Sequence, residues 1–244
     1  MSVEIIAEIG INFGGNLDLA HNMIREAAIS GADIAKFQLY SVDALFGTSG
    51  EDPNEEIYKG VRHTELKRED VAKLIGWCFE EGIEFMASVF DEERFGWLEE
   101  FGVRRHKIAS RTSKLTRGLA EKIAQTGKPC LMSLGFNSKP LDLNKYENVK
   151  YLWCVSEYPT EYSKINLPQT FKDDIFSGFS DHSLGIEASL VAIGRGAKVI
   201  EKHVTYDKSC ENPKFDHVCS IDFLELKELV KYARLMDKVV KYCE

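Results

Sequence analysis

Hydrophobic and polar positions follow two alternating patterns along the chain. Short apolar runs predict buried strands, and the longer segments between them, with apolar residues every three or four positions, predict amphipathic helices. The expected strands are Glu4–Ile9, Asp33–Gln38, Glu84–Phe90, Arg104–Ser110, Pro129–Ser133, Lys150–Val155, Phe176–Phe179 and Lys198–His203. The expected helices are Leu17–Ile29, Arg68–Glu81, Glu92–Phe101, Leu115–Thr126, Ile186–Arg195 and Leu224–Tyr242, with weaker helical spacing near Leu141–Glu147 and Ile165–Phe171.

Strands that alternate with helices build a parallel sheet from βαβ units. Eight such repeats within 244 residues predict a closed (β/α)8 TIM barrel of the α/β class, because an open doubly wound sheet usually has fewer strands. No linker or low-complexity tract divides the chain, so residues 1–244 are expected to form one domain. The longest irregular stretch, Tyr40–Thr64, follows the second strand, and a loop of that length is usually functional.

Composition and charge narrow the possible functions. A hydrophobic content of 44% with 29% charged residues is ordinary for a globular protein, and the net charge of −8 argues against a nucleic-acid surface. No apolar run is long enough to span a membrane, and the N-terminus carries no signal peptide. The six cysteines are scattered without a CxxC pair, which favours reduced thiols in the cytoplasm.

Lysines within apolar strands are the first unusual feature. A TIM barrel places its chemistry at the C-terminal ends of its strands, and Lys36 and Lys107 lie near two of those ends. A buried lysine is costly unless an anion compensates it. Together with hydroxyls at other strand ends, the two lysines predict a site for phosphate and carboxylate groups. The alternative is a structural ion pair with Glu8 or Glu201.

Two histidines are the second unusual feature. His182 and His203 end the seventh and eighth strands, so their rings are expected to meet over the barrel mouth. Glu201 lies two residues before His203 and therefore on the same side of its strand. Two imidazoles near a carboxylate suit a divalent metal with open positions for water or substrate. His106 is expected to face away from Lys107.

Other motifs say less. Asp216 and His217 fall in the irregular run Cys210–Cys219, where a solvated loop and a substrate contact are both open. The glycines form neither GxGxxG nor a Walker motif, so nucleotide binding has no support.

Six segments, in order and at matching spacing along essentially the whole chain, resemble the N-acetylneuraminate (sialic acid) synthase family. They are Ala7-Glu8-Ile9-Gly10-Ile11-Asn12, Gly31-Ala32-Asp33-Ile34-Ala35-Lys36-Phe37-Gln38, Lys107-Ile108-Ala109-Ser110, Ser156-Glu157-Tyr158-Pro159, Ser180-Asp181-His182-Ser183-Leu184-Gly185 and Val199-Ile200-Glu201-Lys202-His203.

The resemblance implies a phosphoenolpyruvate-dependent synthase, a transferase that joins C3 of phosphoenolpyruvate to the aldehyde carbon of an N-acylhexosamine or similar aldose. The product would be a 2-keto-3-deoxy acid of the sialic type, with release of phosphate. By resemblance, phosphoenolpyruvate would be held by Lys36, Lys107, Ser110, Ser133, Ser156 and Ser180; the acceptor sugar by Glu8, Gln38, Tyr158 and Asp216; and Mn2+, or Mg2+ or Co2+, by His182 and His203. Glu8, Lys36, Gln38 and Lys107 are the expected catalytic group.

The chain departs from the family pattern in four places. Phe13 replaces a histidine, Thr112 replaces a glutamate, and Leu134 stands in a segment that usually reads Leu-Ser-Thr-Gly. We also expect the chain to lack the family's C-terminal antifreeze-like domain, because the sequence ends with the predicted eighth helix. We therefore expect a different or smaller acceptor, or a separate lid domain or chain that completes the site. We also expect a homodimer through apolar helix faces.

Two alternatives remain. A related barrel of the 3-deoxy-octulosonate 8-phosphate synthase type would act on a phosphorylated aldose and need basic residues for the second phosphate; Arg104, Arg105 and Arg111 are candidates, and only Arg111 follows a strand end. The other alternative is a divergent, non-catalytic barrel that binds the ligand.

Overall fold

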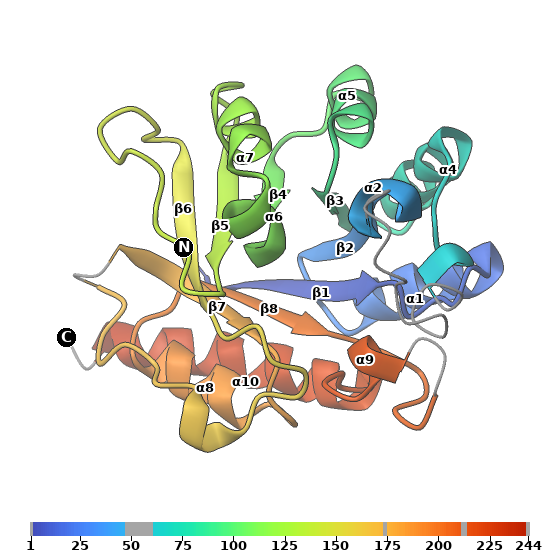
Figure 1. Ribbon diagram of the computed structural model, residues 1–244. Coiled ribbons are helices and arrows are strands. Elements are labelled where there is room, and N and C mark those ends of the chain that lie inside the picture. The colour runs from blue at the N-terminus through green and yellow to red at the C-terminus, as the bar shows by residue number, and fades with distance from the viewer. Residues whose placement is uncertain (1, 47–60, 173–174, 211–213, 243–244) are drawn as a thin grey trace.

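Eight parallel strands close into a barrel, as seen in a computed structural model that describes residues 2–46, 61–172, 175–210 and 214–242 (Figure 1). Each strand pairs with the next one in the chain, and β8 pairs with β1, so the predicted TIM barrel is confirmed. The strands are β1 (Glu4–Gly10), β2 (Ile34–Leu39), β3 (Glu84–Val89), β4 (His106–Ile108), β5 (Cys130–Leu134), β6 (Val149–Cys154), β7 (Phe176–Asp181) and β8 (Val199–His203).

Helices surround the barrel, and α8 and α10 pack side by side along β7 and β8 (Figure 1). Among the described residues, none of these helices is both long and apolar enough to cross a membrane. The helices are α1 (Leu17–Ile29), α2 (Val42–Phe46), α4 (Arg68–Glu80), α5 (Glu92–Glu100), α6 (Ser110–Leu115), α7 (Arg117–Ala124), α8 (Glu187–Gly194), α9 (Lys214–His217) and α10 (Phe223–Tyr242), with a 3₁₀ helix, η1, at Tyr162–Lys164.

Local sequence signals explain why helix α1 has the predicted bounds. The side chain of Asn16 accepts hydrogen bonds from the backbone amides of Asp18 and Leu19, which satisfies two of the free amides at the helix start. Ala20, Met23, Ile24 and Ala27 then form one buried face. These buried side chains join the main core, which lies between the strands and the surrounding helices.

Two predicted helices are wrong. Residues 141–147 and 165–171 contain no α-helix, and the connection after β6 carries only η1 among its described residues. Pro168 lies inside the second segment, where a proline breaks a helix. The apolar residues that suggested helices instead anchor loops: Leu141 and Ile165 are buried, and the indole of Trp153 donates to the carbonyl of Ile165 at 2.8 Å.

The expected irregular stretch Tyr40–Thr64 lies partly outside the described residues, and its described part contains α2. Helix α6 begins directly after β4 and takes up Ser110–Leu115, which the sequence pattern did not predict as a separate helix.

The interior of the barrel is layered. One apolar cluster fills its middle: Ile6, Ile34, Met86, Leu131, Leu152 and Val199. Side chains two residues apart on a strand face the same side, so the next inward positions form a second layer nearer the C-terminal ends of the strands. That second layer is polar: Glu8, Lys36, Ser88, Ser133, Cys154 and Glu201. The apolar cluster therefore lies beneath the polar layer, which borders the mouth of the barrel.

Candidate active site

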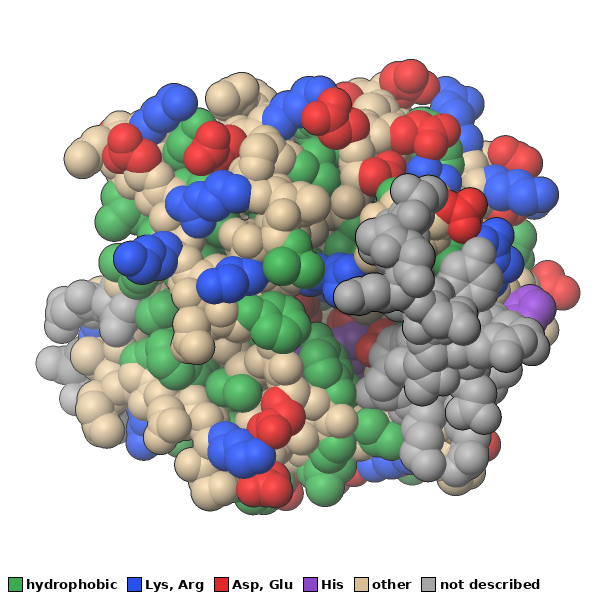
Figure 2. All heavy atoms as spheres, in the orientation of Figure 1, with side chains coloured by type: hydrophobic (Ala, Val, Ile, Leu, Met, Phe, Trp, Pro, Cys, Tyr) green, Lys and Arg blue, Asp and Glu red, His purple; other side chains and the backbone are tan. Residues whose placement is uncertain are grey.

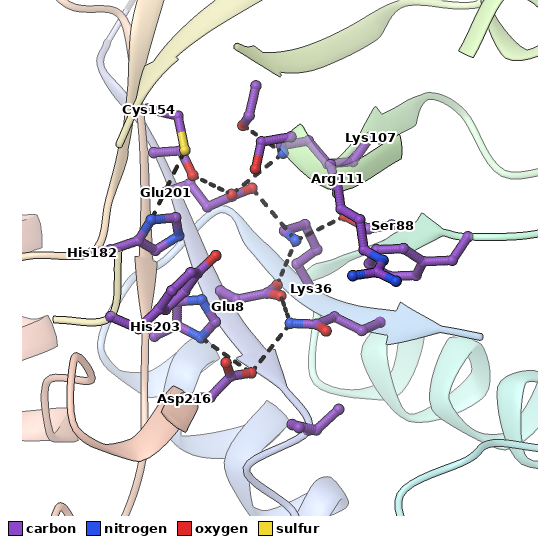
Figure 3. A pocket seen from close by; sticks show the side chains of 18 of the residues that line it. Glu8, Lys36, Ser88, Lys107, Arg111, Cys154, His182, Glu201, His203 and Asp216 are labelled. Atoms are coloured by element: carbon purple, nitrogen blue, oxygen red, sulfur yellow. Dashed lines mark hydrogen bonds and ion pairs between the residues drawn. The ribbon is translucent and has the colours of Figure 1, made fainter. Parts of the chain in front are cut away.

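A cavity of about 430 Å³ opens at the C-terminal ends of the strands. Figure 2 shows the hollow on this face, with histidine and acidic side chains at its floor. All eight strands contribute residues to its lining, and the side chains converge in the close view of Figure 3. The predicted site residues that line it are Glu8, Lys36, Gln38, Lys107, Ser110, Ser133, Tyr158, Ser180, His182, His203 and Asp216.

Ser156 is the one predicted site residue that does not line the cavity. It lies behind Ser110, and the two hydroxyl oxygens are 2.8 Å apart. Ser156 therefore lies next to the cavity, and it contacts a cavity-lining residue, Ser110, rather than the cavity itself.

Strand register explains why these side chains meet. Glu8 is the register partner of Lys36 on β2 and of His203 on β8, so three candidate residues lie at one height in the barrel. Ser180 is likewise paired with Glu201. Because the register is fixed by backbone pairing, each of these contacts follows from the closed sheet rather than from a flexible loop.

Two lysines and two glutamates form a buried charged cluster at the mouth. Lys36 Nζ lies 2.7 Å from Glu8 Oε2 and 3.6 Å from Glu201 Oε2. Lys107 Nζ lies 3.4 Å from Glu201 Oε1, so Glu201 reaches both amines (Figure 3). All four side chains are at most 7% exposed. The structural ion pairs that the sequence left open are thus present for both lysines.

Burial and these partners together set the protonation of the cluster. Burial alone favours a neutral amine, but the carboxylates of Glu201 and Glu8 hold the pKa of Lys36 above its usual value. For Lys107 burial dominates and its pKa is lowered, although Glu201 opposes this. Burial likewise raises the pKa of Glu8, whereas Lys107 and Lys36 overcome burial and lower the pKa of Glu201 to about 2. Lys36 and Glu201 therefore remain charged at neutral pH.

Serine hydroxyls surround this cluster. Lys36 donates to Ser88 Oγ at 3.1 Å, and Lys107 donates to Ser133 Oγ at 2.8 Å. Ser180 donates to Glu201 Oε1 at 2.7 Å. The lysines are therefore held in place on several sides, and their amines face a cavity lined by further hydroxyl groups.

The two histidines lie on the opposite side of the cavity from Arg111 (Figure 3). Their ring centroids are 5.5 Å apart, and the ring of Tyr158 lies 4.2 Å from that of His182. His182 Nδ1 is 2.8 Å from the carbonyl oxygen of Val155, which can only accept, so Nδ1 carries a proton and Nε2 is the nitrogen left for a ligand. Burial is outweighed by Cys154, which raises the pKa of His182 above its ordinary value. Burial and the neighbouring His182 hold the pKa of His203 well below its ordinary value, so its ring is neutral.

The two imidazoles fit a divalent cation. Both rings are buried, His203 Nδ1 has no hydrogen-bond partner, and the backbone carbonyl that fixes His182 is the kind of outer contact that orients a metal-binding imidazole. Within the described part of the chain, no group of three or more His, Cys, Asp or Glu side chains is arranged for a metal. The protein would thus supply two nitrogen ligands and leave other positions to water and substrate.

The side-chain amide of Gln38 bridges two carboxyl groups beside His203. Gln38 Nε2 donates to Glu8 Oε1 and to Asp216 Oδ2, both at 3.2 Å. Asp216 lies 3.8 Å from His203 Nδ1, and burial together with Glu8 raises its pKa to about 7. Asp216 belongs to helix α9 and is buried, so the solvated loop considered for this position is wrong.

Sequence reasoning missed Ser88. It left Glu201 open as a carboxylate beside the histidines or as the partner of a lysine, and in the structure Glu201 bridges both lysines. Ser88 could have been found, because it lies near the C-terminal end of β3, where a TIM barrel gathers polar groups. Cys154 also lines the cavity, with its sulfur 3.9 Å from His182 Nδ1.

Arg105 is not at the mouth. It lies at the N-terminal end of the barrel, where it pairs with Glu4 at 2.8 Å and Glu84 at 2.7 Å, so it cannot bind a second phosphate in this cavity. Arg111 does line the cavity, and its guanidinium donates to the carbonyl of Leu45 at 2.7 Å. His106 faces outward, as predicted, and contacts Glu99 at 2.8 Å.

The positions that depart from the family pattern have structural partners. Phe13 is buried in the main core and packs edge-on against Phe37, with ring centroids 6.1 Å apart. Thr112 donates to the carbonyl of Val89 at 3.1 Å, and Leu134 is buried in β5. None of the three lines the cavity, so these replacements affect residues that pack behind the cavity and not those that line it.

Comparisons with known proteins agree on one family. The sequence model of the NeuB family matches residues 23–243. N,N'-diacetyllegionaminic acid synthase of Legionella pneumophila is 35% identical over 98% of this chain and 74% of its own length, and human N-acetylneuraminate-9-phosphate synthase is 35% identical over 97% and 70%. The crystal structure of N-acetylneuraminic acid synthetase from Leptospira borgpetersenii, in complex with citrate, superimposes with a TM-score of 0.86 at 32% identity, covering 98% of this chain and 85% of that one.

Proposed function

This chain belongs to the NeuB family and is a phosphoenolpyruvate-dependent transferase that forms carbon–carbon bonds, and we propose that its acceptor is an aldehyde sugar of the N-acylhexosamine type. The proposed product is a 2-keto-3-deoxy acid of the sialic type, with release of phosphate. The observation that carries the proposal is the pair of buried lysines, ringed by hydroxyls, at the floor of an open cavity.

Phosphoenolpyruvate would bind at this floor. Lys36 and Lys107 offer ammonium donors, and Ser110, Ser133 and Ser180 offer hydroxyls, which together match the phosphate and carboxylate oxygens. The carboxylate of Glu201 keeps both amines in place before the ligand arrives. Such preorganisation lowers the cost of orienting the enol phosphate for attack.

The acceptor would lie between the lysines and the histidines. Glu8, Gln38, Tyr158 and Asp216 line this part of the cavity and can bind sugar hydroxyls. His182 and His203 would hold one divalent cation, Mn2+ or else Mg2+ or Co2+, which when bound supplies Lewis-acid polarisation of the aldehyde oxygen. This role is supported by the neutral ring of His203, by its Nδ1, which has no hydrogen-bond partner, and by the Val155 carbonyl that orients the ring of His182.

The reaction then has two bond-forming steps. C3 of phosphoenolpyruvate attacks the aldehyde carbon, and the aldehyde oxygen takes up a proton to become a hydroxyl. Water adds at C2, the bond from C2 to the phosphate oxygen breaks, and phosphate leaves as C2 becomes a ketone. Lys36 and Lys107 are placed to stabilise the negative charge on the phosphate-bearing centre during the second step.

A phosphorylated aldose is a second candidate acceptor, favoured by Arg111. Its guanidinium lines the cavity, has no carboxylate partner among the described residues, and uses one hydrogen bond on Leu45. A free guanidinium suits bidentate binding of a phosphate. The name of the human relative likewise indicates a phosphorylated product.

One assay separates the two acceptors. Phosphate release from phosphoenolpyruvate is measured with Mn2+ and matched pairs of aldoses, each with and without a terminal phosphate. An N-acylhexosamine-type acceptor predicts turnover with the unphosphorylated sugars that is unaffected by Arg111→Met. Turnover only with the phosphorylated sugars, lost in Arg111→Met, would reject the N-acylhexosamine-type acceptor and support the phosphorylated aldose. No phosphate release with any aldose would contradict both.

We also propose that the chain acts in the cytoplasm as a homodimer, and that a lid domain or separate chain covers the acceptor. Sedimentation at micromolar concentration tests the dimer, which would be contradicted by a single species at the monomer mass of 27.6 kDa.

A further inference from the structure

A second ion pair lies directly behind the two histidines, on the outer side of the barrel wall. Asp181 on β7 and Lys202 on β8 are register partners, with Nζ 3.4 Å from Oδ2 and both side chains 0% exposed. They alternate with Ser180 and Glu201, which face the cavity, so Asp181 and Lys202 point towards α8. Each of the two directly precedes a histidine in the chain.

The contacts of Asp181 enclose His182. Its Oδ1 accepts from the backbone amide of Ser183 at 2.8 Å and from the Ser183 hydroxyl at 2.6 Å. The first of these bonds closes a turn whose middle residue is His182. Asp181 Oδ2 accepts a hydrogen bond from the hydroxyl of Ser189 on α8 at 2.6 Å, which connects the turn to this helix.

Lys202 joins this turn to the neighbouring strand. Its ammonium group donates to the carbonyl of Ser183, on the far side of His182 from Asp181. Because Lys202 is the residue before His203, a single buried contact fixes the backbone next to both histidines. The Asp181–Lys202 pair thus holds the backbone on both sides of His182 and directly before His203.

We propose that Asp181 and Lys202 are positioning residues that set the distance and orientation of His182 and His203, and thereby the affinity of the site for a divalent cation. The cation itself rests on the function proposed above. Stability alone does not explain the pair, because the cost of burying two charges roughly offsets their attraction, and apolar replacements of such pairs are often neutral. Its place beside both histidines does explain it.

The test uses a double variant, Asp181→Asn with Lys202→Met, which removes both charges and leaves no unpaired one. Asparagine keeps an oxygen for the Ser183 amide, and methionine keeps an unbranched apolar stem. The matched control is Glu84→Gln with Arg105→Met, which removes the contacts of Arg105 with Glu84 and Glu4 at the opposite end of the barrel. Mn2+ affinity is measured from the free-ion EPR signal, and folding from the urea midpoint.

We expect the positioning variant to remain folded and to bind Mn2+ at least 10-fold more weakly, in the range typical of changes to groups that orient metal ligands. The control should bind Mn2+ within twofold of the wild type. A folded positioning variant that also binds within twofold would overturn the proposal. If the double variant does not fold, Ser189→Ala removes a single bond to Asp181 and should weaken binding by about threefold; unchanged binding there would also overturn it.

A second readout does not need the metal. In the wild type the Nδ1 proton of His182 bonds to the carbonyl of Val155, and its NMR resonance should be protected from exchange. We expect this resonance to shift or broaden in the positioning variant and to stay unchanged in the control. A wild type that binds no Mn2+ would contradict the proposed metal alone, and the His182 resonance would then decide the positioning: an unchanged resonance overturns it.

Discussion

The barrel carries a charged layer at each end, and β1 supplies a glutamate to both. At the N-terminal end, Glu4 and Glu84 pair with Arg105, and the three side chains are 21–24% exposed. At the mouth, Glu8 and Glu201 pair with two lysines and are at most 7% exposed. One apolar layer separates the two ends.

The difference lies in what surrounds the charges. The N-terminal cluster meets solvent, where water screens an ion pair and reduces its worth. The mouth cluster is buried yet borders a cavity, so its charges bear the full cost of desolvation while still being reachable by a ligand. Stability accounts for the first arrangement, whereas binding of an anion accounts for the second.

The largest expected effect comes from neutralising the mouth. Lys36→Met combined with Glu8→Gln removes the contacts of Lys36 with Glu8 and Glu201 and leaves Lys107 balanced by Glu201. We expect kcat/KM for phosphoenolpyruvate to fall by about 1,000-fold, because a charged donor at the reacting phosphate is lost, and the free energy of unfolding to stay the same or rise. Steady-state phosphate release and urea unfolding measure the two quantities. A near wild-type kcat/KM in this variant would contradict the prediction and show that the charged cluster at the mouth is structural, like the cluster at the N-terminal end.

The matching change at the N-terminal end should do the reverse. Glu84→Gln with Arg105→Met should lower the free energy of unfolding by about 1 kcal/mol, the order of a partly exposed ion pair, and leave kcat/KM within twofold. The loss should shrink in 1 M NaCl, because salt screens exposed charges in the wild type. A large loss of activity in this variant would contradict the claim that the N-terminal cluster contributes to stability alone.

A smaller effect is expected from Ser88→Ala. Ser88 accepts a hydrogen bond from Lys36 within the mouth, and the hydroxyl of Ser133 does the same for Lys107. Losing one such bond should raise KM for phosphoenolpyruvate about fivefold, equivalent to roughly 1 kcal/mol. An unchanged KM, measured beside Ser133→Ala as a companion, would show that Ser88 does not help to hold the lysine.

Alternation along the strands was enough to predict the barrel and most of the site. Strand ends are where a TIM barrel gathers polar groups, so Lys36, Lys107, His182 and His203 could be selected from the sequence. Glu8 and Glu201 could be named only as alternative partners of a lysine, because the sequence does not show which amine each carboxylate reaches. Glu201 reaches Lys107 from the opposite side of the barrel, and that contact depends on barrel closure, which local patterns do not encode.

Loops were predicted less well than strands, for a related reason. Residues 141–147 and 165–171 have helical apolar spacing, but they form loops, and their apolar side chains are buried from those loops. Asp216 was left open because its burial depends on a contact with Gln38, 178 residues earlier in the chain. The spacing of apolar residues predicts which positions are buried, but it does not predict whether a helix or a loop carries them or which distant residues cover them.

Thermal unfolding with and without phosphoenolpyruvate tests most directly whether the mouth is an anion site. A ligand at about 100 times its Kd stabilises the folded state by about 2.7 kcal/mol, which raises Tm by several degrees in a chain of this length. The account predicts such a rise for the wild type and for the N-terminal variant, and its loss in Lys107→Met, which should fold but bind about 2–3 kcal/mol more weakly. A wild-type Tm that does not move at millimolar phosphoenolpyruvate would contradict the account.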